Sequence, residues 1–168
     1  MTKVPSVPET IKYLALLYFL EDFFFYSAHY LLHTPFLYRH VHKIHHEYNT
    51  SVSIAGFHMH IFEAFLSNGL PSKIYISLVS LAFGEIHITI VTIWMILRMY
   101  DAHNGHSGYN FSWTPIQILP FCANDDFHDF HHSHNCGNYS SQLRIWDIVF
   151  GTSKPFKEYK KKTKKGRK

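Results

Sequence analysis

The sequence is short of charged residues and of cysteine. Of its 168 residues 17% are charged, against about 25% in average proteins, while 46% are hydrophobic and 17% aromatic. This composition favours a single domain associated with a membrane. The two cysteines, Cys122 and Cys136, do not form C-x-x-C. They therefore indicate neither a disulfide framework nor a thiolate zinc site, and a reducing, cytosol-facing environment is expected.

Positive charge is also scarce outside the C-terminal end. Nine of the sixteen Lys and Arg residues lie within 154–168, beside a single acid, Glu158, so residues 1–153 carry a net charge of −4. We expect 154–168 to be a solvated, disordered basic tail that lies on the cytosolic side of a membrane domain. A role in binding nucleic acid is not expected. The short polar stretch 1–10 shows no secretory cleavage pattern and is expected to lead into one domain over 11–153.

Long uninterrupted apolar runs are missing at the N-terminal end. Residues 11–32 read as one helix, with Thr10 as its cap, but Glu21 and Asp22 interrupt the run. Because about 20 apolar residues are needed to span a bilayer core, a shallow or partial insertion is expected. Pro35 should end this helix, and a second helix is predicted over Tyr38–His46.

The longest apolar stretch covers about residues 61–100 and is broken at Gly84–Glu85. It has two interpretations: a single tilted span that buries Glu85 and His87, or a hairpin that turns at Gly84–Glu85. A charge at the centre of a bilayer is costly, which favours the hairpin. Both of its ends would then return to the same side. The predicted fold is an all-α, membrane-embedded helical bundle with a cytosol-facing site.

Histidine is the residue in excess, with fifteen copies. Most lie in three groups at helical spacing, and two of these groups share the pattern H-x-x-H-H although they start 86 positions apart. Residues three and four apart share one face of a helix, so each group should point its rings in one direction. The groups are His29 and His33; His42, His45 and His46; and His128, His131 and His132.

Neutral imidazole is the commonest protein ligand for divalent metals and suits iron, zinc and copper. Eight aligned rings exceed the four ligands of one tetrahedral zinc, so they predict two metal ions held close together. His106, which follows the apolar hairpin, is expected as a ninth ligand, with His103 and His60 as further candidates. Asp129 and Glu47 border the groups and are expected to accept an imidazole N–H, and Glu21 and Asp22 are more distant candidates for the same role. The remaining histidines, His40, His58, His87 and His134, are interpreted as non-ligands.

An all-histidine pair of irons has a characteristic chemistry. It can bind O₂ between the metals and form an oxidant that takes hydrogen from an unactivated C–H bond. That chemistry requires an apolar substrate and the exclusion of water, which an aromatic-rich membrane domain provides. Zinc can replace iron at such a site.

The pattern resembles the fatty acid hydroxylase and sterol desaturase superfamily, and within it most closely the C4-methylsterol monooxygenases. The resemblance covers about residues 11–155 and rests on the three histidine groups together with short flanking motifs. These motifs are ED at 21–22, HKIHHEY at 42–48, HSGYNF at 106–111, HDFHH at 128–132, GNYSS at 137–141 and WDIVFGT at 146–152.

The resemblance implies an endoplasmic reticulum membrane enzyme that oxidises the C4 methyl group of sterol precursors. It implies two irons, O₂, and electrons from NAD(P)H delivered through cytochrome b5 or a reductase. The implied ligands are the eight grouped histidines together with His106, which matches the histidine of the family's HSGY motif.

Some positions depart from the family pattern. Asn110 and Gly56 stand where an acid is common, and Ile148 stands where a basic residue is common. His60 is followed by Ile61–Phe62–Glu63 in place of Pro-Leu-Glu. The family usually has a further membrane segment before the first histidine group. These departures concern the substrate more than the metal site.

Three other interpretations remain. Two lie in the same superfamily, a sterol C5-desaturase and a fatty acid or sphingolipid hydroxylase, because the histidine boxes are shared among them. The third is a non-catalytic metal-binding membrane protein. A metal carrier should place its ligands along a path through the membrane, whereas these histidines flank the apolar hairpin, which favours catalysis.

Overall fold

The computed structural model describes residues 3–50, 52–109, 121–123 and 125–165. It confirms the predicted all-α class: these residues contain helices and one isolated β-bridge, but no strand. Asn110, one of the departures from the family pattern, lies outside the described residues. None of the helices in the described part is both long enough and apolar enough to cross a membrane.

The first helix, α1, runs over Val7–Leu32 and starts earlier than predicted. Its cap is Ser6, not Thr10. The Ser6 Oγ accepts from the Glu9 backbone N–H at 3.4 Å, and the Glu9 carboxylate accepts from the Ser6 N–H at 3.3 Å. This reciprocal pairing satisfies two backbone donors of the first turn, where a proline is also tolerated.

The predicted second helix is divided in two. Helix α2 covers Pro35–His40, and the 3₁₀ helix η1 covers His42–Glu47. Val41, between them, has a φ of −128° and a ψ of −66°, which interrupts the helical geometry. A second 3₁₀ helix, η2, follows at Ser53–Phe57. The first H-x-x-H-H box therefore lies on a short 3₁₀ segment and not on an α-helix.

The apolar stretch folds back on itself, as the hairpin interpretation expects. Helix α3 (Ile61–Glu63) continues through a π-helical segment, η3 (Ala64–Gly69), into α4 (Leu70–Phe83). Gly84 then adopts a φ of 95°, which favours glycine. Helix α5 (Ile88–Gly105) returns beside α4.

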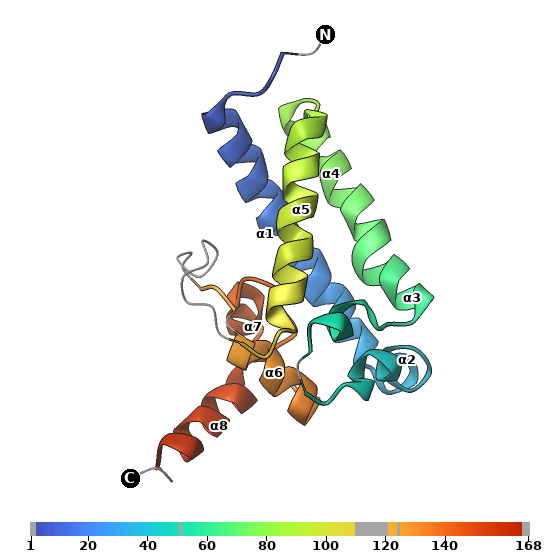
Figure 1. Ribbon diagram of the computed structural model, residues 1–168, viewed down its shortest axis with the longest axis vertical. Coiled ribbons are helices and arrows are strands. Elements are labelled where there is room, and N and C mark those ends of the chain that lie inside the picture. The colour runs from blue at the N-terminus through green and yellow to red at the C-terminus, as the bar shows by residue number, and fades with distance from the viewer. Residues whose placement is uncertain (1–2, 51, 110–120, 124, 166–168) are drawn as a thin grey trace.

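Helices α1, α4 and α5 pack together along the long axis of the molecule (Figure 1). The side chains buried between them are mostly aromatic or branched, and each is no more than 5% exposed: Tyr13, Leu17, Tyr75, Val79, Ile90 and Trp94. The Tyr13 hydroxyl donates to the Phe83 carbonyl at 2.8 Å and so ties the start of α1 to the end of α4. This packing holds the lower ends of α1 and α5, which carry site residues, in fixed positions.

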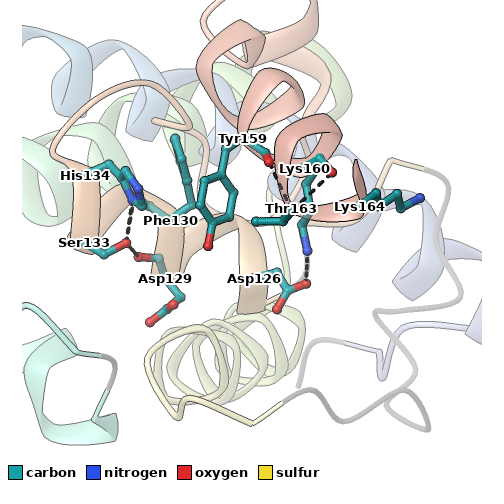
Figure 2. A pocket seen from close by; sticks show the side chains of 9 residues that line it. All are labelled: Asp126, Asp129, Phe130, Ser133, His134, Tyr159, Lys160, Thr163 and Lys164. Atoms are coloured by element: carbon teal, nitrogen blue, oxygen red, sulfur yellow. Dashed lines mark hydrogen bonds and ion pairs between the residues drawn. The ribbon is translucent and has the colours of Figure 1, made fainter. Parts of the chain in front are cut away.

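The C-terminal third forms three further helices, α6 (Asp125–His134), α7 (Ile145–Val149) and α8 (Lys154–Lys165). Helix α8 corrects the expectation of a disordered tail. Phe156 is buried, with its ring centroid 5.5 Å from that of Phe127 and 5.3 Å from that of Phe130. Figure 2 shows Lys160 of α8 paired with Asp126 of α6. The apolar face of this basic segment is what orders it.

Candidate metal centre

The structure brings nine of the predicted ligands together in two clusters. Within each cluster, one ring nitrogen of every histidine lies within 4.8 Å of those of the others. The five-histidine cluster contains His29, His33, His42, His46 and His131, and the four-histidine cluster contains His45, His106, His128 and His132. Seven of the nine are buried, His33 is partly exposed, and His106 is 9% exposed. The clusters are adjacent, with the ring centroids of His46 and His132 only 4.8 Å apart.

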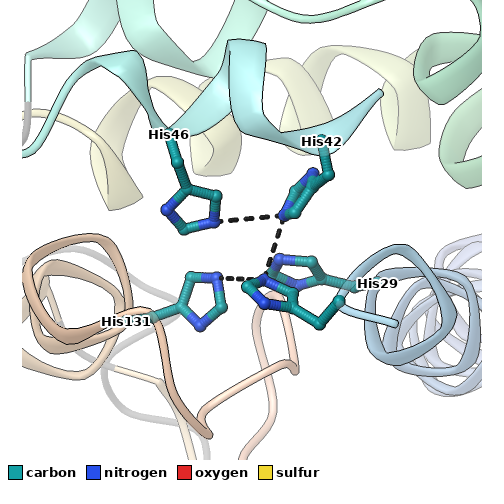
Figure 3. Close-up of side chains that lie close together, drawn as sticks. His29, His42, His46 and His131 are labelled. Atoms are coloured by element: carbon teal, nitrogen blue, oxygen red, sulfur yellow. Dashed lines mark hydrogen bonds between the residues drawn. The ribbon is translucent and has the colours of Figure 1, made fainter. Parts of the chain in front are cut away.

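Each H-x-x-H-H box contributes to both clusters. In the first box the outer residues, His42 and His46, join the five-histidine cluster, and His45 joins the other. In the second box the distribution is reversed, because His131, its middle residue, belongs to the five-histidine cluster. Figure 3 shows His42 and His46 on one segment facing His29 and His131, which come from two others.

The remaining ligands come from the ends of long helices. His29 lies in the last turn of α1, and His33 follows directly as its C-cap. His106 is the C-cap of α5. A Cβ atom added to Gly56 would lie 3.1 Å from the His106 Nδ1, so a glycine there leaves room for the ring. That contact gives a structural reason for glycine at a position where the family often has an acid.

Six of the nine rings are held at Nδ1 by an acceptor. The Nδ1 of His42 lies 2.9 Å from the Glu63 carboxylate. In five others it lies 2.6 to 3.2 Å from a backbone carbonyl: His29 (Tyr139), His45 (His58), His106 (Ala102), His131 (Gly137) and His132 (Tyr48). A carbonyl only accepts, so Nδ1 carries the hydrogen, and the Nε2 of a neutral ring presents a lone pair.

The Nε2 atoms within each cluster converge on one another. The His33 Nε2 lies 3.1 Å from the Nε2 atoms of both His42 and His131. In the four-histidine cluster, the His128 Nε2 lies 2.8 Å from that of His106 and 3.0 Å from that of His132. His33 and His128 are thus the central rings of two sets of three. A neutral central ring has at most one hydrogen at Nε2, whereas both of its neighbours present a lone pair to it.

A cation at the centre of each cluster would resolve that conflict, because several imidazole lone pairs can bind the same ion. In addition, the His29 Nε2 is buried and has no hydrogen-bond partner among the described residues. The donor set therefore fits two neighbouring metal ions.

The electrostatics favour the metal-binding form of these rings. Burial, together with neighbouring histidines, lowers the pKa of His33 to about 2 and that of His132 to about 3. Burial likewise lowers the pKa values of His45, His128 and His131 well below the ordinary range. The rings are therefore neutral near pH 7, so protons do not compete with a metal for their lone pairs.

The other candidates lie outside both clusters. His103 is exposed, and its Nδ1 bonds the Met99 carbonyl at 2.8 Å. The His60 Nδ1 accepts from the Phe62 N–H at 3.0 Å and caps α3. His40, interpreted as a non-ligand, bonds the Phe36 carbonyl at 2.8 Å.

The expected carboxylate partners also lie elsewhere. Glu47 is exposed and pairs with His58 at 2.9 Å, and Asp129 lies on the exposed face of α6. Among the contacts that the structure describes, Glu63 is the carboxylate beside a clustered ring, and sequence reasoning did not select it. The sequence did contain a sign of this role, because Glu63 is an acid inside an apolar helical stretch. An acid buried there requires a polar partner.

Comparison with known proteins identifies the group to which this arrangement belongs. The sequence profile of the fatty acid hydroxylase family matches residues 14–152. The chain belongs to the fatty acid hydroxylase family. No solved structure matches it significantly.

Several curated relatives of this fatty acid hydroxylase family member are about one-third identical to it. The very-long-chain aldehyde decarbonylase GL1-11 of Oryza sativa subsp. indica is 38% identical over 86% of this chain and 54% of its own length. The C-4 methylsterol oxidase erg25 of Schizosaccharomyces pombe is 35% identical over 95% of this chain and 53% of its own. Methylsterol monooxygenase 2-2 of Arabidopsis thaliana is 33% identical over 94% and 58%. The chain thus spans little more than half the length of these relatives.

A cavity of about 460 Å³ opens onto both clusters. Rings from both clusters line it, among them those of His42 and His128, together with apolar side chains such as Phe25 and Leu32. In this family member a single cavity therefore places a largely apolar wall beside rings of both clusters.

Glu21 and Asp22 tie the frame together and contact no cluster. Glu21, in the cavity wall, accepts from the Trp94 Nε1 at 2.9 Å and pairs with Arg98, which joins α1 to α5. Asp22 accepts from the backbone N–H groups of Gln142 and Leu143 at 2.9 and 3.1 Å. Glu21 therefore positions the helices that carry His29 and His106, and Asp22 fixes α1 to the segment that precedes α7.

Proposed function

We propose that this chain is a di-iron oxygenase that oxidises the C4 methyl group of sterol precursors with O₂ and electrons from NAD(P)H delivered through cytochrome b5. The observation that carries the proposal is the pair of adjacent, buried, all-imidazole clusters beside a largely apolar cavity. The proposed ligands are the nine clustered histidines, with Glu63 and the backbone carbonyls in place of Glu47 and Asp129 as their partners.

Iron at the two clusters would supply the reductive activation of O₂ that a C–H oxidation needs. The chain supplies the rest. The Nδ1 bonds hold each ring with its lone pair toward the cluster, and the lowered histidine pKa values keep the rings neutral. Burial excludes water from the reaction, and the apolar cavity wall positions a hydrocarbon against the clusters.

The choice of a sterol rests on the named relatives from Schizosaccharomyces pombe and Arabidopsis thaliana, which match nearly the whole chain. The rice relative supports a second candidate, a very-long-chain aldehyde as substrate. The cavity accepts either class in principle, because its wall combines apolar side chains with the polar pair Glu21 and Arg98. The identity of the reaction product distinguishes the two candidate substrates.

We further propose that residues 11–153 form a unit embedded in the endoplasmic reticulum membrane, with both clusters and the C-terminus toward the cytosol. Helices α4 and α5 expose large apolar side chains, which include Leu81 (86% exposed), Ile88 (70%) and Ile96 (62%). A contiguous apolar surface of this kind favours contact with lipid. The α4–α5 turn and the clusters lie toward opposite ends of the molecule, so the turn can enter lipid while the site stays at the cytosolic side.

The test is expression of the chain in a yeast strain that lacks C4-methyl oxidation, with sterols profiled by mass spectrometry. We expect 4-methyl sterols to decline and their oxidised products to appear. The His45→Ala variant should leave the profile unchanged. Persistent 4-methyl sterols with metal bound would reject the sterol substrate, and alkane formed from a supplied long-chain aldehyde would then support the second candidate.

A further inference from the structure

A second cavity, of about 300 Å³, lies between α6, α7 and α8, and its lining includes no clustered histidine. Four basic residues line it: Arg144, Lys157, Lys160 and Lys161. Among the described lining residues there is no carboxylate. This composition distinguishes the cavity from the neighbouring groove of Figure 2, where Asp126 and Asp129 offset Lys160 and Lys164.

Most of the positive charge around the 300 Å³ cavity is not neutralised by the protein. Lys160 is paired, since its ammonium contacts the Asp126 carboxylate. In the described part of the chain no ion pair involves Arg144, Lys157 or Lys161. Three cations around one small cavity repel each other, and a bound anion would relieve that repulsion.

Two polar atoms at this cavity lack hydrogen-bond partners. The Arg144 Nε and the Ser153 Oγ are both buried without a partner among the described residues. Ser153 is only 3% exposed and directly precedes the first turn of α8, whose N-terminal end favours an anion. Buried donors are nearly always paired, so the two atoms favour an acceptor that the described residues do not supply.

The rest of the lining is apolar. Phe127 and Phe156 are buried, and Ile148 lies near them at the cavity. We propose that this cavity binds an amphiphile whose oxyanion, a phosphate or a carboxylate, contacts Arg144 and Ser153 while its apolar part lies against the two phenylalanine rings. This binding site is separate from the metal clusters and does not depend on the proposed oxygenase activity.

The proposal is tested by calorimetric titration of the purified full chain with hexyl phosphate, inorganic phosphate and hexanol. We expect hexyl phosphate to bind at least about tenfold more tightly than either half-molecule, because it makes both the ionic and the apolar contacts. Arg144→Gln should weaken its binding about tenfold or more, and Lys157→Gln should weaken it to a smaller extent. Higher salt should weaken binding to the unsubstituted chain.

Lys162→Gln is the matched control, because Lys162 is exposed on the same helix but does not line the cavity. Its affinity should equal that of the unsubstituted chain. If Arg144→Gln binds hexyl phosphate as tightly as the unsubstituted chain, the proposed site is wrong. If Lys162→Gln and Lys157→Gln lose the same amount of affinity, the ligand is attracted diffusely to α8 and the site is again wrong. Lys157 is exposed, so its substitution tests the site even if Arg144→Gln fails to fold. Inorganic phosphate binding as tightly as hexyl phosphate would overturn the apolar part of the proposal.

The source of the oxyanion is distinguished with vesicles. Neutral phosphatidylcholine vesicles, with and without phosphatidic acid, are floated with the purified chain. Binding that requires phosphatidic acid and is lost in Arg144→Gln supports a lipid headgroup as the ligand. Hexyl phosphate binding without any difference between the two kinds of vesicle supports a soluble amphiphile.

Discussion

The two H-x-x-H-H boxes have the same pattern but different backbones. The first lies on the 3₁₀ helix η1, and the second lies on the α-helix α6. Each sends its outer histidines to one cluster and its middle histidine, His45 or His131, to the other. Neither box can therefore assemble a cluster alone, and each cluster forms only when segments more than 80 residues apart pack together.

The boxes also differ in what supports them. In the first box, His42 is fixed by the Glu63 carboxylate and His45 by a loop carbonyl. In the second box, all the Nδ1 partners that the structure shows are backbone carbonyls, and the rear of α6 is packed by Phe127 and Phe130 against α8. The first box thus depends on a side-chain partner, whereas the second depends on core packing.

The largest expected effect comes from removal of a middle histidine. His45→Ala leaves three rings in the four-histidine cluster, so bound metal should fall from about two ions per chain to about one, and oxidation should be lost. His131→Ala leaves four rings in its cluster and should lower metal content less, although it too should abolish activity. Elemental analysis by mass spectrometry measures this. His40→Ala, an exposed histidine of α2, is the control, and full metal content in His45→Ala would contradict the assignment.

The packing behind the second box gives the next prediction. Phe127 is 0% exposed, so Phe127→Ala should lower the free energy of unfolding by about 3–5 kcal/mol and displace His128 and His131. Phe36→Ala, at a position 71% exposed, should change it by less than about 1 kcal/mol. Denaturant unfolding of both variants measures the difference. Similar values for the two would show that α6 is not supported in this way.

The side-chain partner of the first box should matter less. Glu63→Gln replaces the carboxyl group beside the His42 Nδ1 with an amide, a weaker acceptor, which should lower the affinity of the five-histidine cluster for metal by about 10- to 100-fold. Competition with a chelator measures this affinity. Glu47→Gln, on the exposed acid that pairs with His58, should leave it unchanged. An unchanged affinity in Glu63→Gln would remove the distinction between the two boxes.

The last prediction is a dependence on pH that both clusters share. The unfolded chain gains protons on its histidines below about pH 6.5, whereas the folded pKa values of His33 and His132 are about 2 and 3. Between these values the unfolded state binds more protons, so stability falls as pH falls. The metal-free chain should therefore melt at a lower temperature at pH 5.5 than at pH 7.5. A melting temperature that does not change between these pH values would contradict the predicted neutrality of the rings.

Much of this site could be predicted from the sequence. Histidine spacing selected eight of the nine clustered residues, because groups of imidazoles three and four residues apart share one helix face. His106 was selected by its position after the apolar hairpin and by the HSGY motif. The apolar stretch interrupted at Gly84–Glu85 predicted the reversal between α4 and α5. The pattern was misleading where local geometry decides, as at the Ser6 cap, at the interruption of the helix at Val41 and in the tail ordered by Phe156.

Spacing along the chain is enough to predict which residues are available to hold metal and roughly which segments are helical. The packed fold is needed to see how the nine rings divide between two clusters, which backbone carbonyls and which acid fix their Nδ1 atoms, and where the cations around Arg144 gather. These features depend on contacts between residues distant in sequence. No local pattern encodes such contacts, since they arise when α1, α5 and α6 pack against one another.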